Sequence, residues 1–112
     1  MTAAAFRKLA LALPGSHEEP HFDRASFRMG KKIFATLTAD GAQVMVRVAP
    51  PERLFALLSG RPDVFFDHGA WSVRHGSLGI RLAKVDPALM RELLVDSWRH
   101  IAPKRARAAL SR

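Results

Sequence analysis

Residues 25–48 constrain the fold of this chain most, because apolar and polar side chains alternate along them in short runs separated by two turn signals. The first signal, Met29-Gly30-Lys31, is a tight basic turn, and the second, Asp40-Gly41, is a common hairpin turn. Side chains of a strand point alternately to its two faces, so each run can bury one face. The pattern predicts a hairpin over residues 25–37, followed by a third antiparallel strand over residues 43–48.

The alternation also predicts which side chains each strand buries. In the second strand of the hairpin, one face is expected to carry Ile33, Ala35 and Leu37. The other face is expected to carry Phe34 and Thr36. In the third strand, the residues expected to point inward are Val44, Val46 and Val48.

Three segments show the period of an amphipathic α-helix. Thr2 can cap a helix over residues 2–13, and a second helix is expected over residues 50–60, where two prolines mark its start. A third helix is expected over residues 86–101. Phe55 and Trp98 lie on the apolar stripes of the last two helices and are expected in the core.

The remaining segments are harder to assign. Residues 16–24 are polar and are expected to be irregular. Residues 61–77 are either a mobile loop or short strands, one at Val64-Phe65-Phe66 and another at Trp71-Ser72-Val73. A clear alternating strand follows over residues 78–82.

The order of these elements predicts the fold class. Helices before, between and after antiparallel strands are typical of an α+β fold. We expect a single two-layer domain over residues 1–112, with the N-terminal and C-terminal helices packed on one face of a twisted antiparallel sheet. The other face would be left to solvent or to a partner. Residues 104–112 are expected to form a basic tail.

Composition bears on the class of function. The chain has 18 Lys and Arg against 10 Asp and Glu, a formal net charge of +8. Such a charge would attract nucleic acid or acidic partners. The alternative is that it follows from the coding bias of the host. The absence of cysteine excludes disulfides, thiolate metal ligands and cysteine nucleophiles. Arg7 and Lys8 interrupt the first apolar run, so it reads as a helix of the fold and not a signal peptide. We expect a cytoplasmic protein with no membrane partner and assume a monomer.

Cations gather where the predicted strands point outward and in the turns between them. This candidate nucleic-acid site consists of Arg28, Lys31, Lys32, Arg47, Arg74, His75 and Arg81. Such a surface could contact phosphates without sequence choice, and each contact would add about one unit to the salt dependence of binding. Met45 and Phe34 could add apolar contacts to bases. The alternative is that the cations are ordinary solvated groups and that Phe34 is buried under a helix.

Two further clusters of charged side chains are candidate sites. The tail could follow a phosphate backbone or could favour the dipole of a frayed helix end, and its cations are Lys104, Arg105, Arg107 and Arg112. A possible metal cluster is His17, Glu18, Glu19, His21 and Asp23. It lacks the ligand types and spacing of structural zinc sites, so we expect no metal and expect His21-Phe22 to pack the loop onto the sheet.

No catalytic constellation is evident in the sequence. His68, His75 and His100 are scattered and have no evident Ser or Asp partners, and there is no tyrosine. Gly76-Ser77-Leu78-Gly79 is too short for a phosphate-binding loop and leads into a strand. We therefore expect a non-enzymatic protein without a cofactor.

Motifs along nearly the whole chain match a known family in order and spacing. The most specific is Gly30-Lys31-Lys32-Ile33-Phe34-Ala35-Thr36-Leu37. The others are Leu11-Ala12-Leu13-Pro14-Gly15 with Glu18-Glu19, His21-Phe22, Phe27-Arg28, Pro50-Pro51-Glu52 with Leu54, Pro62 with Phe65 and His68, and Leu89, Leu93, Ser97-Trp98 and Ala102-Pro103-Lys104. In these motifs the chain resembles the MmcQ/YjbR family of small bacterial proteins, often labelled DNA-binding.

The resemblance implies a CyaY-like, "double wing" arrangement of helices around a twisted sheet. The chain departs from the family in one place, since the family usually carries Gly-Trp before its final strand and this chain has Gly76-Ser77-Leu78. Trp71, earlier in the same loop, can partly substitute for that aromatic residue.

Two functions are compatible with these observations. The preferred one is a small bacterial protein that binds nucleic acid, most simply DNA, through the basic sheet face and hairpin turns. The alternative is a protein-interaction or ligand-sensing domain of the same fold, in which the charge aids solubility. A metal-handling module of CyaY-like shape would be expected to carry an acidic ridge, and this chain has no run of more than two acidic residues.

Overall fold

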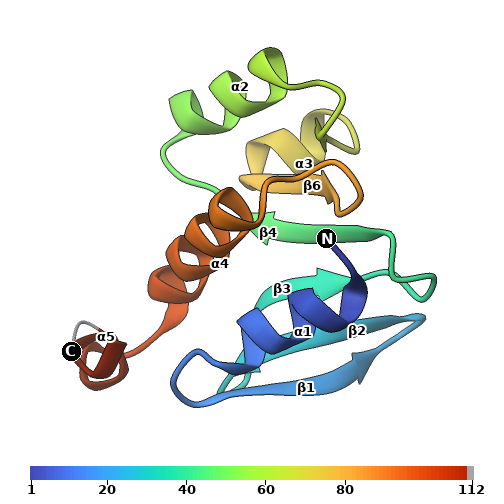
Figure 1. The fold of residues 1–112 in the computed structure, drawn as a ribbon. Coiled ribbons are helices and arrows are strands. Elements are labelled where there is room, and N and C mark those ends of the chain that lie inside the picture. The colour runs from blue at the N-terminus through green and yellow to red at the C-terminus, as the bar shows by residue number, and fades with distance from the viewer. Residues whose placement is uncertain (111–112) are drawn as a thin grey trace.

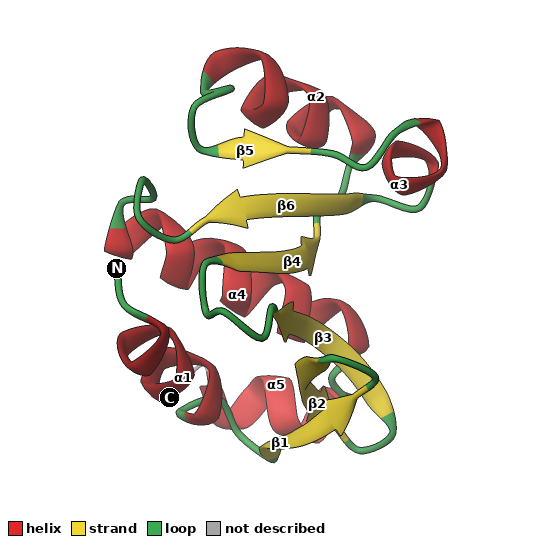
Figure 2. Cartoon of the chain, turned by 90° about the vertical axis from the view of Figure 1, so that its right-hand side faces the viewer, coloured by secondary structure: helices red, strands yellow, loops and turns green. Residues whose placement is uncertain are grey.

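One antiparallel sheet organises the part of the chain that this computed structural model describes, residues 1–110. Its strands are β1 (Ser16–His21), β2 (Arg24–Met29), β3 (Lys32–Leu37), β4 (Gln43–Arg47), β5 (Phe65–Phe66) and β6 (Ser77–Arg81). They lie in the order β1-β2-β3-β4-β6-β5, which runs from bottom to top in Figure 2. The helices of this part are α1 (Ala3–Leu11), α2 (Pro51–Gly60), α3 (Ala70–Arg74), α4 (Pro87–Ile101) and α5 (Lys104–Leu110). None of these helices combines the length and the apolar character that a bilayer crossing needs.

The predicted hairpin and third strand are confirmed as β2, β3 and β4. Gly30, at the β2–β3 turn, has a φ of 64°, a left-handed conformation that glycine adopts without strain. In the β3–β4 turn, the Asp40 carboxylate accepts hydrogen bonds from Thr38 Oγ1 at 2.6 Å and from the Ala42 N–H at 3.0 Å. These two bonds lower the pKa of Asp40. The turn is therefore fixed by its own side chains.

The faces of β3 differ from simple alternation because a bulge interrupts its pairing with β2. Phe27 opposes Ala35 and Arg28 opposes Ile33, so Phe34 has no partner across the ladder. An extra residue of this kind lets two neighbours face the same side, and Phe34 and Ala35 are each only 2% exposed. The prediction that Phe34 shares the outward face and could contact bases is wrong.

The prediction that residues 16–24 are irregular is also wrong, because most of them form β1. All six residues of β1 pair with β2. As an edge strand, β1 is largely exposed on both faces and shows no apolar alternation, and Pro20 is tolerated there. Phe22 lies in the turn that follows, at a φ of 58° and 94% exposed, so it does not pack the loop onto the sheet.

The segment between α2 and β6 contains one predicted strand and one unexpected helix. Phe65 and Phe66 form β5, the far edge strand. The strand expected at Trp71-Ser72-Val73 is instead the short helix α3. It lies between Gly69 and Gly76, whose φ values of 99° and 70° let the chain turn sharply at each end.

Helices α1 and α4 cover one face of the sheet, which confirms the α+β two-layer prediction. The rings of Phe6 in α1 and Phe27 in β2 meet edge to face at 5.3 Å. Trp98 of α4 is fully buried, as expected. Phe55 of α2 is 54% exposed, so the expectation that it belongs to the core is wrong. Figure 1 shows α2 and α3 beyond the β4–β6 part of the sheet.

The middle of the sheet is a seam with little backbone pairing. β3 and β4 share three residue pairs, against five between β4 and β6. Where the two strands separate, Ser97 Oγ of α4 accepts a hydrogen bond from the Arg47 N–H at 3.1 Å and donates one to the Phe34 carbonyl at 2.6 Å. Trp98 Nε1 donates to the Pro14 carbonyl at 3.2 Å. Helix α4 therefore joins the two halves of the sheet, β1-β2-β3 and β4-β6-β5.

Candidate nucleic-acid interface

The strand register decides which side chains lie on the face opposite α1 and α4. Val44 and Val46 of β4 are buried, so Gln43, Met45 and Arg47 point to the other side. Their pairing partners extend this surface across the sheet. We call it the open face, and its residues in β2 to β6 are Arg24, Ser26, Arg28, Ile33, Thr36, Gln43, Met45, Arg47, Phe66, Ser77, Gly79 and Arg81.

The three arginines predicted on strands share this face and have no carboxylate partner. Arg28 comes from β2, Arg47 from β4 and Arg81 from β6. Within residues 1–110, no ion pair involves any of them or Arg24. The sequences of β2, β3, β4 and β6 contain no aspartate or glutamate. The positive charge of this surface is therefore not neutralised within the strands that form it.

Arg28 is held in place by neutral groups. Its Nε donates a hydrogen bond to Ser26 Oγ at 2.9 Å, and Ser26 Oγ donates to the Glu19 carbonyl at 2.8 Å. The edge strand β1 also brings the Glu19 carboxylate to this side, where it lies 2.6 Å from Nε2 of His17. Arg28 is thus oriented along its strand while its charge remains uncompensated.

Arg81 is held by an aromatic ring. Its guanidinium carbon lies 4.7 Å from the centroid of Phe66, and Nη1 donates to the Pro62 carbonyl at 3.3 Å. The Phe66 ring can lie across β6 because Gly79 has no side chain. A Cβ at Gly79 would come within 2.4 Å of that ring.

Arg47 lies beside a shallow hollow above the seam. The hollow has a volume of about 220 Å³, and its lining includes Ile33, Thr36, Met45, Arg47, His75 and Ser77. It combines apolar side chains with one guanidinium and one imidazole. Such a lining can accept a flat apolar group with an anionic substituent.

The other four predicted cations lie off the open face of the strands. Lys31 is exposed in the β2–β3 turn, and Lys32 opposes Met29, so it points to the helix side. Arg74 ends α3 and His75 follows it, so neither is on a strand. His75 lines the hollow beside Arg47, and Arg74 lines a neighbouring depression with Arg47.

The structure adds three basic side chains that sequence reasoning missed. Arg24 shares the open face with Ser26 and Arg28, a placement that alternation gives once β2 is known to start at residue 24. Arg99 and His100, in the last turn of α4, line a further depression with Arg47. No sequence signal relates α4 to β4, so only the tertiary fold could have shown this proximity.

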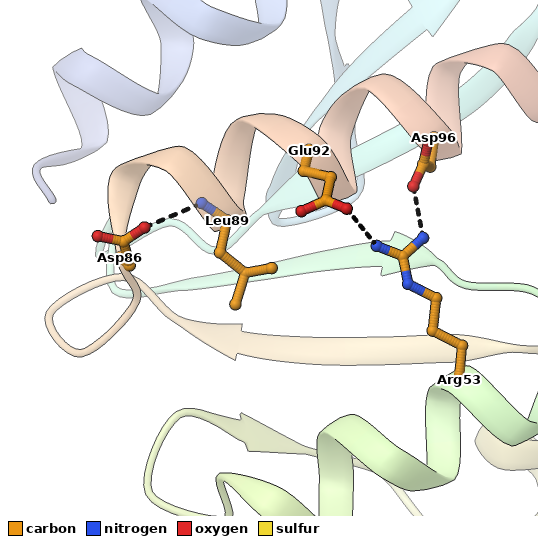
Figure 3. A network of polar contacts seen from close by, with 5 residues as sticks. All are labelled: Arg53, Asp86, Leu89, Glu92 and Asp96. Atoms are coloured by element: carbon orange, nitrogen blue, oxygen red, sulfur yellow. Dashed lines mark hydrogen bonds and ion pairs between the residues drawn. The ribbon is translucent and has the colours of Figure 1, made fainter.

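Three arginines away from the open face are paired with carboxylates. Figure 3 shows Arg53 of α2 reaching two acidic residues of α4, with Nη2 at 3.2 Å from Glu92 Oε1 and Nη1 bonded to Asp96. Arg61 Nε lies 3.2 Å from Asp63 Oδ1, and this contact lowers the pKa of Asp63. Arg7 Nε lies 3.2 Å from Glu18 Oε1. The same figure shows the Asp86 carboxylate capping α4 through the Leu89 N–H at 3.1 Å.

The two secondary candidates of the sequence were the tail and the acidic-histidine cluster. Lys104, Arg105 and Arg107 lie on α5, whereas Arg112 is outside the described residues. Among residues 1–110, no three His, Asp or Glu side chains are placed to hold a metal ion together.

The split antiparallel sheet with helices on one face defines an α+β domain whose open face carries four arginines. A family model, YjbR, matches residues 11–100, and the chain belongs to the YjbR family. The predicted resemblance to the MmcQ/YjbR family is thereby confirmed.

A solved structure shows a similar fold. It is the crystal structure of the Deinococcus radiodurans protein DR2400, whose domain is described as DUF419. The two share 23% sequence identity with a TM-score of 0.79, over 98% of this chain and 88% of that one. At this identity the likeness concerns the fold alone. No curated protein matches the chain.

Proposed function

We propose that this chain is a small, non-enzymatic, cytoplasmic protein that binds nucleic acid, with DNA as the expected partner, through the open face. One observation carries the proposal. Four neighbouring strands contain no acidic residue, and four of their cations, Arg24, Arg28, Arg47 and Arg81, lie on the side that α1 and α4 leave uncovered.

The physical basis is the exchange of counterions for phosphates. Arginine side chains that neutralise phosphates release the cations condensed on the nucleic acid, which favours binding at low salt. A guanidinium can also donate two parallel hydrogen bonds to one phosphate. Arg28 and Arg81 are already oriented by Ser26 and Phe66, so binding would cost less side-chain entropy there.

Such contacts give affinity without sequence preference. Phosphate contacts fix position and orientation, while base edges carry the sequence information. Lys31 would continue the basic surface at the tip of the β2–β3 hairpin, and Arg74 would continue it before the start of β6. We therefore propose non-specific binding in which several weak contacts add together.

The test compares two double substitutions that remove the same charge. Arg28→Ala with Arg47→Ala removes two unpaired arginines of the open face, and Arg7→Ala with Arg61→Ala removes two that are paired with carboxylates. Binding to a DNA duplex is measured by fluorescence anisotropy across a salt series. We expect the first variant to lower the log–log salt slope by about two units and the second to leave it nearly unchanged.

Two results would count against the proposal. If both variants weaken binding equally, net charge alone is responsible and the open face has no special role. If the wild-type protein binds no nucleic acid at low salt, the protein-interaction or ligand-sensing alternative is favoured. Where the wild type binds, the charge reversal Lys31→Glu with Lys32→Glu separates the role of the turn from that of the strands. We expect it to weaken binding less than the loss of Arg28 and Arg47.

A further inference from the structure

We infer that Trp71 and His75 form a stacking platform for an unpaired base, so that the open face prefers single-stranded nucleic acid to duplex. The inference rests on the proposed function and specifies the class of nucleic acid. It is carried by a pair of aromatic rings at the end of the sheet where β4 ends and β6 begins.

The two rings already form half of a stack. Their centroids are 4.1 Å apart, with 26° between the ring planes. Nδ1 of His75 donates a hydrogen bond to the Trp71 carbonyl at 2.8 Å, which fixes the imidazole against the indole. Trp71 is nevertheless 68% exposed. Since His75 covers one face of the indole, its other face must be open to solvent.

The platform stands on a firmly anchored helix. Ser72 of α3 is 2% exposed, and its Oγ donates to the Ser77 carbonyl at 3.2 Å, which ties α3 to the start of β6. The Gly69 N–H donates to the Asp67 carboxylate at 2.6 Å, and the Gly76 N–H donates to the Val73 carbonyl at 3.1 Å. Trp71 is therefore exposed on a short helix whose two ends and buried serine are hydrogen-bonded.

Cations lie beside the His75 end of the platform. His75 lines the hollow that also contains Met45 and Arg47, and Arg74 lines the next depression with Arg47. We expect the guanidinium groups of Arg47 and Arg74 to contact the phosphates of a strand whose base stacks on Trp71. Further along the face, Arg81 over Phe66 repeats the combination of ring and cation.

This arrangement suits a single strand better than a duplex. In a duplex the faces of each base are already stacked on its neighbours, whereas a single strand can turn a base onto a protein ring. Aromatic side chains combined with a basic groove are the usual means of binding single strands without sequence choice. Phe55 is also exposed, at 54%, but lies on α2 outside the open face and serves as a control.

Tryptophan fluorescence can test the platform directly, because the chain has two tryptophans and Trp98 is fully buried. The protein is titrated with an oligothymidine and an oligouridine of about 12 nucleotides, and with a DNA duplex of the same length. We expect both single strands to quench the emission and to bind several-fold more tightly than the duplex. The ratio between the two single strands shows whether the sugar matters.

Three variants complete the test. Trp71→Ala should weaken single-strand binding about tenfold while changing duplex affinity less than about twofold. Trp71→Phe keeps a ring and should retain most of the affinity, and Phe55→Ala should behave as wild type. Binding of the variants is followed by anisotropy, and circular dichroism confirms their fold.

Failure of the inference and failure of the proposed function give different results. If the duplex binds as tightly as the single strands, or both Trp71 variants bind single strands like wild type, the inference is overturned while binding through the arginines stands. If none of the three nucleic acids binds at low salt, the proposed function is overturned and the inference with it.

Discussion

The arginines on the helix side of the sheet and those on its open face have different partners. On the helix side, Arg53 meets Glu92 and Asp96, and Arg7 of α1 meets Glu18 of β1. On the open face, Arg28 donates to the hydroxyl of Ser26 and Arg81 lies over the ring of Phe66. Arg47 lines the hollow. The cations are many and the carboxylates are few. The position of the carboxylates therefore distinguishes a surface that stabilises the fold from a surface that can bind a polyanion.

The largest effect on the free energy of unfolding is expected on the helix side of the sheet, at the seam. Ser97→Ala removes the side chain that bonds the Arg47 N–H and the Phe34 carbonyl, leaving buried polar groups without partners. We expect the free energy of unfolding to fall by about 2–3 kcal/mol, measured by urea denaturation. Ser59→Ala, at an exposed position of α2, is the matched control and should change it by less than about 0.5 kcal/mol. Equal effects of the two would show that the seam does not depend on Ser97.

A smaller effect is expected on the open face, where Phe66 lies across Gly79. Gly79→Ala would bring a methyl group against the ring and displace it from Arg81. We expect a loss of about 1–2 kcal/mol in the free energy of unfolding, which is within the usual range for overpacking. Gly60→Ala adds a methyl group where no other atom is near and should cost nothing. A neutral Gly79→Ala would mean that the ring is loosely held and that the open face is less ordered than the helix side.

The comparison itself is tested by two single arginine substitutions. Arg53→Ala should lower the free energy of unfolding by about 1 kcal/mol, because its partners Glu92 and Asp96 are largely solvated. Arg47→Ala should lower it by less than about 0.5 kcal/mol but weaken nucleic-acid binding. Denaturation and anisotropy on the same samples measure both. If the two variants changed the free energy of unfolding and nucleic-acid binding to the same extent, the division between structural and binding arginines would be wrong.

The smallest expected effect concerns pH at the β3–β4 turn. The pKa of Asp40 lies below its ordinary value of 3.8 because Thr38 and the Ala42 N–H stabilise the carboxylate. Its contribution to stability is thus fully present above pH 3.8 and is lost as the pH falls through the lower pKa of the folded state. The difference in denaturation midpoint between wild type and Asp40→Asn should shrink in that window. A difference that persists at the lowest pH would point to the geometry of the turn instead of its charge.

Sequence reasoning succeeded where a periodic pattern was long enough to read. It predicted α1, α4 and the strands around the Gly30 turn, because burial imposes a repeat on them. It missed β1, since an edge strand exposed on both faces carries no such repeat. It also missed α3, which is too short to show a helical period, and the bulge at Phe34, which is a single inserted residue.

The candidate site was predictable to a similar extent. Alternation correctly placed Arg47 and Arg81 opposite the buried residues of their strands, and it would have placed Arg24 had the start of β2 been recognised. It could not bring His75 or Arg99 beside Arg47, because those approaches depend on how α3 and α4 pack against the sheet.

The scarcity of backbone pairing between β3 and β4 has a consequence for how this surface could change among relatives. Three residue pairs join the halves and Ser97 bonds to both strands behind the gap, so we expect the side chains of α4 to influence the angle between the halves. Replacements at the buried positions of α4 could therefore increase or decrease the curvature of the open face without altering any residue on that face. The shape of the open face would then depend on residues of the helix that packs against the other side of the sheet.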